Sequence, residues 1–209
     1  MQDKLLPLFP LHVVVFPRTE LPLHIFEERY KEMVGEAIRD KSEFGVVLAK
    51  EEGILNAGCT VVVDTVLKSH PDGRMDIVTR GVRRFEIVML NQEKSYLRGE
   101  VAYFDDDEAE PAPGEVRAEA LRLYQSWSEL EERTPASEAM LSDAQLSFQL
   151  AQGIHDLDFL HFLLRTRSEA LRLKKLAEFL SEYVPRQRIT AIMKKLAPLN
   201  GHGAGRSEM

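Results

Sequence analysis

Residues that could carry catalysis are few in this sequence, and their spacing matches no established catalytic motif. The chain has no G-x-x-x-x-G-K-[ST] phosphate loop, no G-x-S-x-G nucleophile elbow, no H-E-x-x-H zinc helix and no C-x-x-C pair. The glycines of Gly201–Gly205 lie in a polar tail, without the preceding strand and following helix that a nucleotide loop needs. The sequence therefore predicts no enzyme of these classes and no cofactor.

The histidines and the single cysteine favour structural roles. His155 and His161 are six residues apart, which places them off a common helical face, so they do not form a ligand pair. Asp156 is better explained as a helix cap than as a metal ligand. Cys59 has a valine-rich flank and is expected to be a small buried apolar residue. We predict no metal site.

Composition places the chain among globular proteins. Hydrophobic residues make up 44% and charged residues 29%, so a sizeable core is available. No apolar run approaches the ~18–20 residues that span a bilayer. The apolar start, Leu5–Phe16, is interrupted by prolines and precedes no cleavage site, which favours a buried strand over a signal peptide. One cysteine fits a reducing compartment, so we expect no membrane association and a cytoplasmic location.

Charge is distributed unevenly along the chain. Residues 1–108 carry 14 basic and 20 acidic side chains, whereas residues 165–195 carry 9 basic and 3 acidic ones. Such a stretch is either a surface for anions or a set of basic helices packed beside acidic ones. The candidate anion or RNA patch consists of Arg172, Lys174, Lys175, Arg186 and Arg188.

The first 104 residues predict short strands around one helix. Apolar or β-branched runs predict strands at Val13–Phe16, Leu21–Ile25, Phe44–Ala49, Cys59–Leu67, Met75–Thr79, Phe85–Met89 and Leu97–Phe104. Gly81, between two of these runs, predicts a bulge or a sharp corner. Glu27–Arg39 has helical periodicity instead and predicts an amphipathic helix that plugs one end of a small, partly open barrel.

An acidic, proline-containing segment, Asp105–Gly114, separates this half from a helical half. Apolar stripes after it predict several helices, with Asp156 and Ser168 as N-caps. Pro185 is expected in the first turn of the last helix or at a kink. The predicted organisation is a β domain at 1–108, a helical domain at 109–197 and a disordered tail at 198–209.

Several of these segments resemble the N-terminal domain of Lon proteases. The start Leu6–Pro17 resembles its L-P-L-x-x-x-V-V-F-P motif, and Asp72–Phe85 resembles its D-G-x-x-x-(I/V)-x-x-x-G-x-x-R-F hairpin. Further similar segments are Leu21–Glu27, Phe44–Leu48, Gly58–Thr60, Leu146–Ala151 and Arg172–Leu176. The resemblance covers nearly the whole chain and is strongest over residues 5–104.

The resemblance implies an α+β fold: a six-stranded PUA-like pseudo-barrel with one inserted helix, followed by a C-terminal helical bundle. In the full protease this region contributes to substrate recognition and oligomer assembly, and an AAA ATPase and a Ser-Lys peptidase follow it. No position of this sequence matches the peptidase nucleophile or an ATPase motif. We therefore expect a non-enzymatic module, and the sequence does not specify its oligomeric state.

Two functions are compatible with the sequence. The first is binding of unfolded or apolar protein segments, or docking onto a protease or chaperone, by burial of apolar side chains and strand addition at a sheet edge. The expected groove lies where strand ends meet the helix, at Phe16, Pro17, Leu21, Pro22 and Phe26. The alternative is RNA binding through the basic helices of 165–195. Against it, the β half is net acidic and its strands show no interleaving of aromatic and basic residues.

Overall fold

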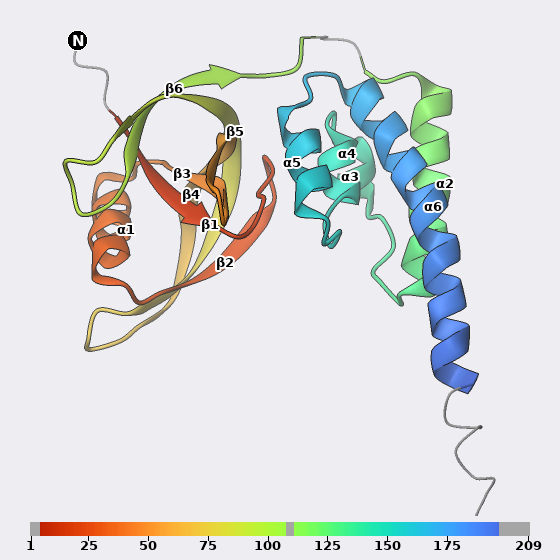
Figure 1. Ribbon diagram of the computed structural model, residues 1–209, viewed down its shortest axis with the longest axis horizontal. Coiled ribbons are helices and arrows are strands. Elements are labelled where there is room, and N and C mark those ends of the chain that lie inside the picture. Colours follow the sequence, from red (N-terminus) through yellow and green to blue (C-terminus); the bar gives the residue numbers. More distant parts are fainter. Residues whose placement is uncertain (1–4, 108–110, 197–209) are drawn as a thin grey trace, which may run out of the picture. The chain divides into compact units, whose positions relative to one another are not determined.

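The chain divides into two compact units. The computed structural model describes residues 5–107 and 111–196, with the backbone alone given for 191 and 194–196. Unit 1 comprises Met1–Ala109 and Ala151–Ser168, and unit 2 comprises Glu110–Leu150 and Glu169–Met209 (Figure 1). The tail at 198–209, with its glycines, lies outside the described residues, so its predicted disorder stays a prediction.

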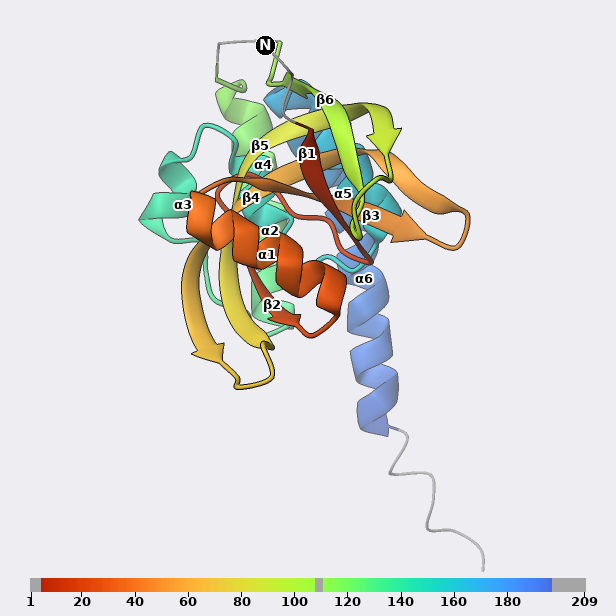
Figure 2. The same cartoon turned by 90° about the vertical axis from the view of Figure 1, so that its left-hand side faces the viewer.

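Unit 1 is built on a six-stranded sheet. Its strands are β1 (Leu6–Leu11), β2 (Glu20–Ile25), β3 (Phe44–Lys50), β4 (Gly53–Ser69), β5 (Met75–Asn91) and β6 (Arg98–Phe104). The strand order is β2-β5-β4-β3-β1-β6, with β1 and β3 parallel and with β6 also paired to β5. Because β5 pairs with both β4 and β6, the sheet curls and closes on itself (Figure 2). The predicted α+β class is confirmed.

Apolar side chains fill the inside of this closed sheet. Leu6, Leu8, Val47 and Phe85 form a buried cluster that joins β1, β3 and β5. Cys59 on β4 is also fully buried, and burial raises the pKa of its thiol to about 12. The thiol therefore stays protonated and unreactive near neutral pH, in agreement with the apolar role expected for it.

The helix inserted after β2 is α1 (Glu28–Asp40), which begins and ends one residue later than expected. Its buried residues are Tyr30, Met33, Val34 and Ala37, at helical spacing. The ring of Tyr30 lies 4.1 Å from that of Phe9 on β1, centroid to centroid, so α1 packs against the sheet. Figure 2 shows α1 lying across the sheet.

The strand predictions are wrong in two respects. Val13–Phe16 is not a strand: Val15 and Phe16 are buried, but the segment forms part of the β1–β2 connection. A buried loop and a buried strand look alike when only the apolar pattern is considered. The predicted strands Met75–Thr79 and Phe85–Met89 form the single strand β5, which pairs with β2 along its first part and with β6 along its second.

A short helix from the second half of the sequence belongs to unit 1. Helix α5 (Leu157–Arg165) packs on β4, and Asp156 caps it as predicted by accepting a hydrogen bond from Phe159 N at 2.9 Å. The expected domain boundary placed this segment in the helical domain. Contact of α5 with β4 places it in unit 1 instead, and its residues Leu160, Leu163 and Leu164 are buried.

Unit 2 is helical. Its elements are α2 (Gly114–Leu130), α3 (Glu138–Ser142), α4 (Leu146–Leu150) and α6 (Glu169–Leu196). Helix α2 packs along α6, and Trp127 is buried with its ring edge-to-face against Tyr124 and Tyr183. Pro185 lies inside the continuous helix α6, which begins directly after the predicted cap Ser168. In the described ranges, no helix is long and apolar enough to cross a membrane.

Candidate functional site

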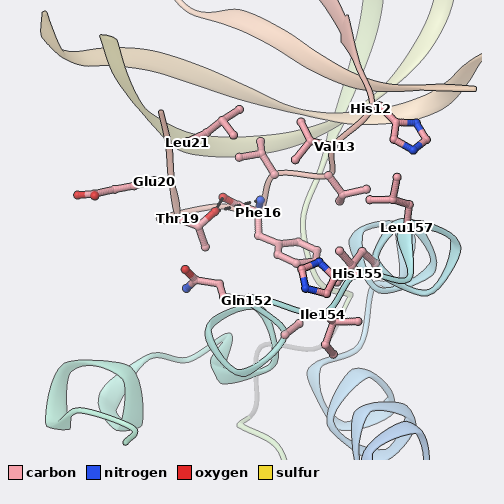
Figure 3. Close-up of a pocket in the computed structure, with 15 residues that line it drawn as sticks. His12, Val13, Phe16, Thr19, Glu20, Leu21, Gln152, Ile154, His155 and Leu157 are labelled. Atoms are coloured by element: carbon pink, nitrogen blue, oxygen red, sulfur yellow. Dashed lines mark hydrogen bonds between the residues drawn. The ribbon is translucent and has the colours of Figure 1, made fainter. Parts of the chain in front are cut away.

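A cavity of about 440 Å³ lies in unit 1 beside the start of β2. Residues 12–16 and 19–21 line one side, and residues 151–155 with Leu157 and Leu160 line the other (Figure 3). Its size falls within the roughly 300–1,000 Å³ typical of ligand pockets. The two lining segments are remote in sequence, so the fold of unit 1 assembles the cavity.

A tight turn before β2 shapes the first wall. Thr19 N donates a hydrogen bond to Phe16 O at 3.2 Å, and the Thr19 hydroxyl donates to the same oxygen at 2.8 Å. Pro17 occupies the second position, and Arg18 at the third has φ 63°. This is the pattern of a type II turn, in which proline favours the second position and the third residue needs a positive φ. The turn holds the Phe16 backbone in place.

Gly81 on β5 fixes this turn to the sheet. Arg18 N donates to Gly81 O at 2.8 Å, and Gly81 N donates to Thr19 O at 2.9 Å. A Cβ atom at Gly81 would lie only 2.0 Å from Phe16 O. The β4–β5 register also shifts between Cys59 and Val61, next to Gly81, which confirms the predicted irregularity. Glycine is therefore required here because two backbone segments approach closely.

The second wall consists of the segment before α5 and the start of that helix. Ile154 and Leu160 are buried, and Leu157 is half-buried. An ion pair between Asp158 and Lys50 of β3 attaches the helix to the sheet. Around the apolar interior, the exposed side chains of His12, Glu20, Gln152 and His155 provide a polar rim.

Side chains of the kinds that act as nucleophiles or metal ligands are few around the cavity. Thr19 is the only residue lining it that bears a hydroxyl or thiol, and that hydroxyl donates to the Phe16 backbone rather than to a side-chain base. Nδ1 of His12 donates to Ala49 O at 3.2 Å. Among the residues that the structure describes, no three His, Cys, Asp or Glu side chains are placed to hold a metal ion.

The structure brings together only part of the predicted groove. Phe16 and Leu21 line the cavity, and Pro17 is buried in the adjoining turn. Pro22 and Phe26 are exposed and do not line it. Residues 151–160 supply the opposite wall, which was expected from α1. The sequence marked the α5 helix, but no local pattern indicated that it would pack beside Phe16.

One of the five residues of the predicted basic patch is not on the surface. Arg172 is fully buried and pairs with Glu169 at 2.7 Å, so its inclusion in a surface patch was wrong. Lys175 pairs with Glu178 at 2.8 Å, and Arg186 with Glu182 at 3.3 Å. Lys174 and Arg188 are exposed. The excess of positive charge in this stretch is therefore partly neutralised by carboxylates one helical turn away.

The buried His161 on α5 predicts a pH dependence for unit 1. Burial lowers the pKa of its imidazole, and Arg165 lowers it further. In the unfolded chain a histidine has a pKa near 6.5. Below about pH 6.5 the unfolded state therefore binds a proton at His161 more readily than the folded state does. We expect the stability of unit 1 to fall as the pH drops below that value, and His161→Gln to reduce this dependence. Thiol labelling of Cys59 in a urea series at several pH values measures it.

The exposed His155 provides the control for this prediction, because His155→Gln removes an imidazole that is not buried. The prediction would be wrong if the stability of unit 1 fell with decreasing pH as much in His161→Gln as in the wild type.

Comparison with known proteins identifies the family. The sequence profile described as the ATP-dependent protease La (LON) substrate-binding domain matches residues 5–194. The chain belongs to this family. Its structure is similar to the crystal structure of a Lon N-terminal domain protein from Xanthomonas campestris, with 26% identity and a TM-score of 0.67 over 83% of this chain and 96% of that one. The resemblance that the sequence motifs suggested is confirmed.

A second structure shares the fold. The N-terminal domain of the Mycobacterium avium complex Lon protease is 18% identical, with a TM-score of 0.63 over 85% of this chain and 98% of that one. Among Lon proteases, that of Parabacteroides distasonis is 32% identical over 121 residues, which are 54% of this chain and 15% of that protein. That of Cytophaga hutchinsonii is 26% identical over 184 residues, 83% of this chain and 22% of that protein. The chain thus matches only a small part of each protease.

Proposed function

We propose that unit 1 binds unfolded polypeptide by burying one apolar side chain in the cavity between residues 12–21 and 151–160. The observation that carries this proposal is the apolar interior of the cavity together with its polar rim. Burial of a hydrocarbon side chain against apolar walls is favourable, and polar groups at the edge can hydrogen-bond with the peptide backbone. Membership of a substrate-binding family supports a protein ligand.

We further propose that the module acts without catalysis. Its one lining hydroxyl is engaged by backbone, which supports a binding role. We also assign the closed sheet of unit 1 to the PUA-like pseudo-barrels and unit 2 to the helical bundles. The β5–β6 pairing supports the first assignment, and the packing of α2 along α6 supports the second.

The cavity is expected to contribute more to binding than strand addition at the sheet edge. Strand β2 is paired on one side, to β5. Pro22 in the middle of β2 has no N–H to offer to an added strand. Burial of a large apolar side chain, by contrast, contributes about 1.5–3 kcal/mol. Specificity should therefore follow the apolar side chains of the ligand.

Leu21→Asp tests this proposal. Leu21 is a half-buried cavity residue, so a carboxylate there should be compatible with folding while opposing the entry of an apolar side chain. We expect affinity for a fluorescently labelled, permanently unfolded model protein to fall by about tenfold or more, since 1.4 kcal/mol corresponds to a factor of ten. Fluorescence anisotropy measures the affinity, and thermal unfolding verifies the fold.

Leu67→Asp is the matched control, because Leu67 is exposed and lies outside the cavity. Apolar binding should persist when salt is raised, whereas phosphate contacts to RNA would weaken steeply. Equal affinity of a folded Leu21→Asp variant and the wild type would refute the cavity as the binding site. If the protein instead bound RNA in a salt-sensitive manner and a Lys174→Glu/Lys175→Glu variant lost this binding, RNA binding would be the supported function.

A further inference from the structure

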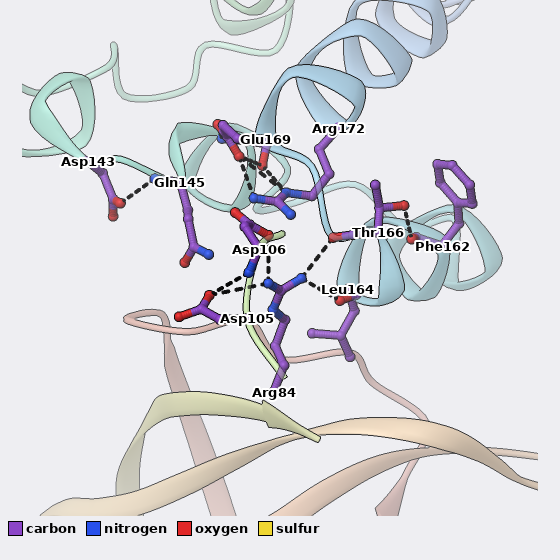
Figure 4. A network of polar contacts seen from close by, with 11 residues as sticks. Arg84, Asp105, Asp106, Asp143, Gln145, Phe162, Leu164, Thr166, Glu169 and Arg172 are labelled. Atoms are coloured by element: carbon purple, nitrogen blue, oxygen red, sulfur yellow. Dashed lines mark hydrogen bonds and ion pairs between the residues drawn. The ribbon is translucent and has the colours of Figure 1, made fainter. Parts of the chain in front are cut away.

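Arg84 is the largest charged side chain buried in unit 1, and the cavity described above makes no direct use of it. It lies on β5, is 1% exposed and points toward the end of α5 (Figure 4). A buried guanidinium must be matched by acceptors, because unpaired N–H groups and charge are costly away from water. Its partners therefore reveal what it holds in place.

Arg84 binds two segments that are distant in the sequence. Nη1 donates to the backbone oxygens of Leu164 at 3.1 Å and Thr166 at 2.8 Å. Nη2 donates to the carboxylates of Asp106 at 2.6 Å and Asp105 at 3.4 Å. One side chain thus connects β5, the residues after β6 and the end of α5.

The contact with α5 is at the end of the helix where a cation is most effective. The last carbonyls of a helix have no partner within the helix and form the negative end of its dipole. Leu164 lies in the last turn of α5, and Thr166 is its C-cap residue. The cap itself is closed by the Thr166 hydroxyl, which donates to Phe162 O at 2.8 Å. Arg84 therefore binds an already formed helix end and attaches it to the sheet.

Other contacts reinforce the same junction. Asp107 N donates to Arg167 O at 2.9 Å, so the residues after β6 lie alongside those after α5. The guanidinium groups of Arg84 and Arg167 each lie over the ring of Phe104, at 4.8 and 4.6 Å from its centroid. Toward the start of α5, one attachment is the ion pair between Asp158 and Lys50, whose Asp158 side chain is largely exposed, and such pairs stabilise weakly. Removing one member of a buried pair costs more than removing one of an exposed pair, so loss of Arg84 should affect α5 more than loss of Lys50.

We propose that Arg84 is a positioning residue for the peptide-binding cavity, because it holds α5, and with it Leu157 and Leu160, against the sheet. This inference rests on the proposed function. It predicts that the cavity has a fixed wall, residues 12–21, and a second wall, residues 151–160, whose position depends on one guanidinium. The bidentate geometry on two carbonyls and two carboxylates cannot be reproduced by a single ammonium.

The test is hydrogen–deuterium exchange of the full chain, read on peptides from 154–165 and from β3 and β4, for wild type, Arg84→Met and Arg84→Lys. We expect exchange of the α5 amides to rise by about tenfold or more in Arg84→Met and by less in Arg84→Lys. The β3 and β4 amides and Cys59 should stay protected. Affinity for the unfolded model protein should fall in the same order. Arg84→Lys keeps the charge and provides the result should Arg84→Met fail to fold.

Arg83→Met is the matched control, since this neighbouring arginine is exposed, stacks on Tyr103 and pairs with Glu43. Wild-type protection of α5 in both Arg84 variants would overturn the proposal. Equal loss of protection across α5, β3 and β4 would also overturn it, because Arg84 would then be a general stabilising residue. The proposal would also be overturned if the Arg84 variants showed faster exchange in α5 but the same affinity for the unfolded model protein as the wild type. Failure of the proposed function is recognised separately, as absent binding by the wild type.

Discussion

Gly81→Ala is expected to lower the free energy of unfolding of unit 1 by about 3 kcal/mol or more. The added Cβ would lie 2.0 Å from Phe16 O, 2.8 Å from Phe16 C and 3.3 Å from the Cα of Pro17. These are backbone atoms, so no side-chain rotation relieves the contact. Overpacking costs about 1–3 kcal/mol, and displacing the turn also weakens two backbone hydrogen bonds to Gly81, each contributing about 1 kcal/mol.

Cys59 offers a direct measurement of this loss. It is the only cysteine of the chain, is fully buried in unit 1 and becomes available to a thiol reagent when the sheet opens. Labelling in a urea series should show a midpoint roughly 1–3 M lower for Gly81→Ala than for wild type, given slopes of about 1–3 kcal/mol per molar. Because the turn carries Phe16, the variant should also bind unfolded protein less tightly at low urea.

Gly35→Ala is the matched control. Gly35 lies within α1, and apart from its chain neighbours and the nearby backbone of that helix a Cβ there would meet no atom within 4 Å. Replacing glycine by alanine in a helix interior stabilises by about 0.5–1 kcal/mol, so this variant should shift in the opposite direction. If both alanine variants unfold at the same urea concentration, the account of Gly81 as a close-approach position is incorrect.

Arg172→Met is expected to destabilise unit 2 by about 3–5 kcal/mol, the cost of leaving one member of a buried ion pair without its partner. Arg172 is fully buried and donates to Glu169 Oε2 at 2.7 Å (Figure 4). It also donates to the Ser147 hydroxyl at 2.9 Å. Glu169 also accepts hydrogen bonds from the backbone N and the hydroxyl of Ser147 at the start of α4. Removing the cation leaves a buried carboxylate in the contact between α4 and α6.

The fluorescence of Trp127 is the probe for this variant, because it is the only tryptophan and is buried in unit 2. Burial already raises the pKa of Glu169, and Arg172 opposes this rise. Without Arg172 the folded protein should favour protonated Glu169 still more. A carboxyl whose folded pKa is raised destabilises as the pH rises through that pKa, so the variant should be relatively more stable in mild acid.

Adding Glu169→Gln to Arg172→Met should recover most of the lost stability, since the amide keeps hydrogen bonds to Ser147 without a buried charge. Lys174→Met, at an exposed position two residues further along α6, should change stability by no more than about 0.5 kcal/mol. An Arg172→Met variant as stable as Lys174→Met would show that the buried pair contributes little.

Local features of the fold followed from the sequence because their causes are local. Period-3.6 spacing predicted α1 within one residue, and the Asp156 cap was predicted from its side chain and position. The segment Asp72–Phe85, which resembles the family's hairpin, begins in the turn between β4 and β5, where Gly73 has a φ of 83°. The motifs at 6–17 and 72–85 predicted the family, which the match over residues 5–194 confirmed.

The candidate site was only half predictable. Phe16 and Leu21 stood out because proline and apolar residues cluster near them, but Pro22 and Phe26 share that pattern and lie outside the cavity. Arg172 and Lys174 are two positions apart in one basic stretch, yet the first is buried and the second exposed. Residue type alone does not show whether a given arginine or lysine of a basic helix lies on its buried face or on its exposed face.

By itself, the sequence determined the α+β class, the helix α1, the approximate positions of most strands and the family, since these depend on side-chain periodicity, caps and turns. Only the tertiary structure decided that residues 151–168 join the sheet of unit 1, that Gly81 makes room for Phe16 O and that Arg84 binds the end of α5. Each of these depends on contacts between segments at least 65 positions apart in the chain. Such contacts form where buried polar groups must find partners and apolar surfaces must be covered, and no local pattern encodes them.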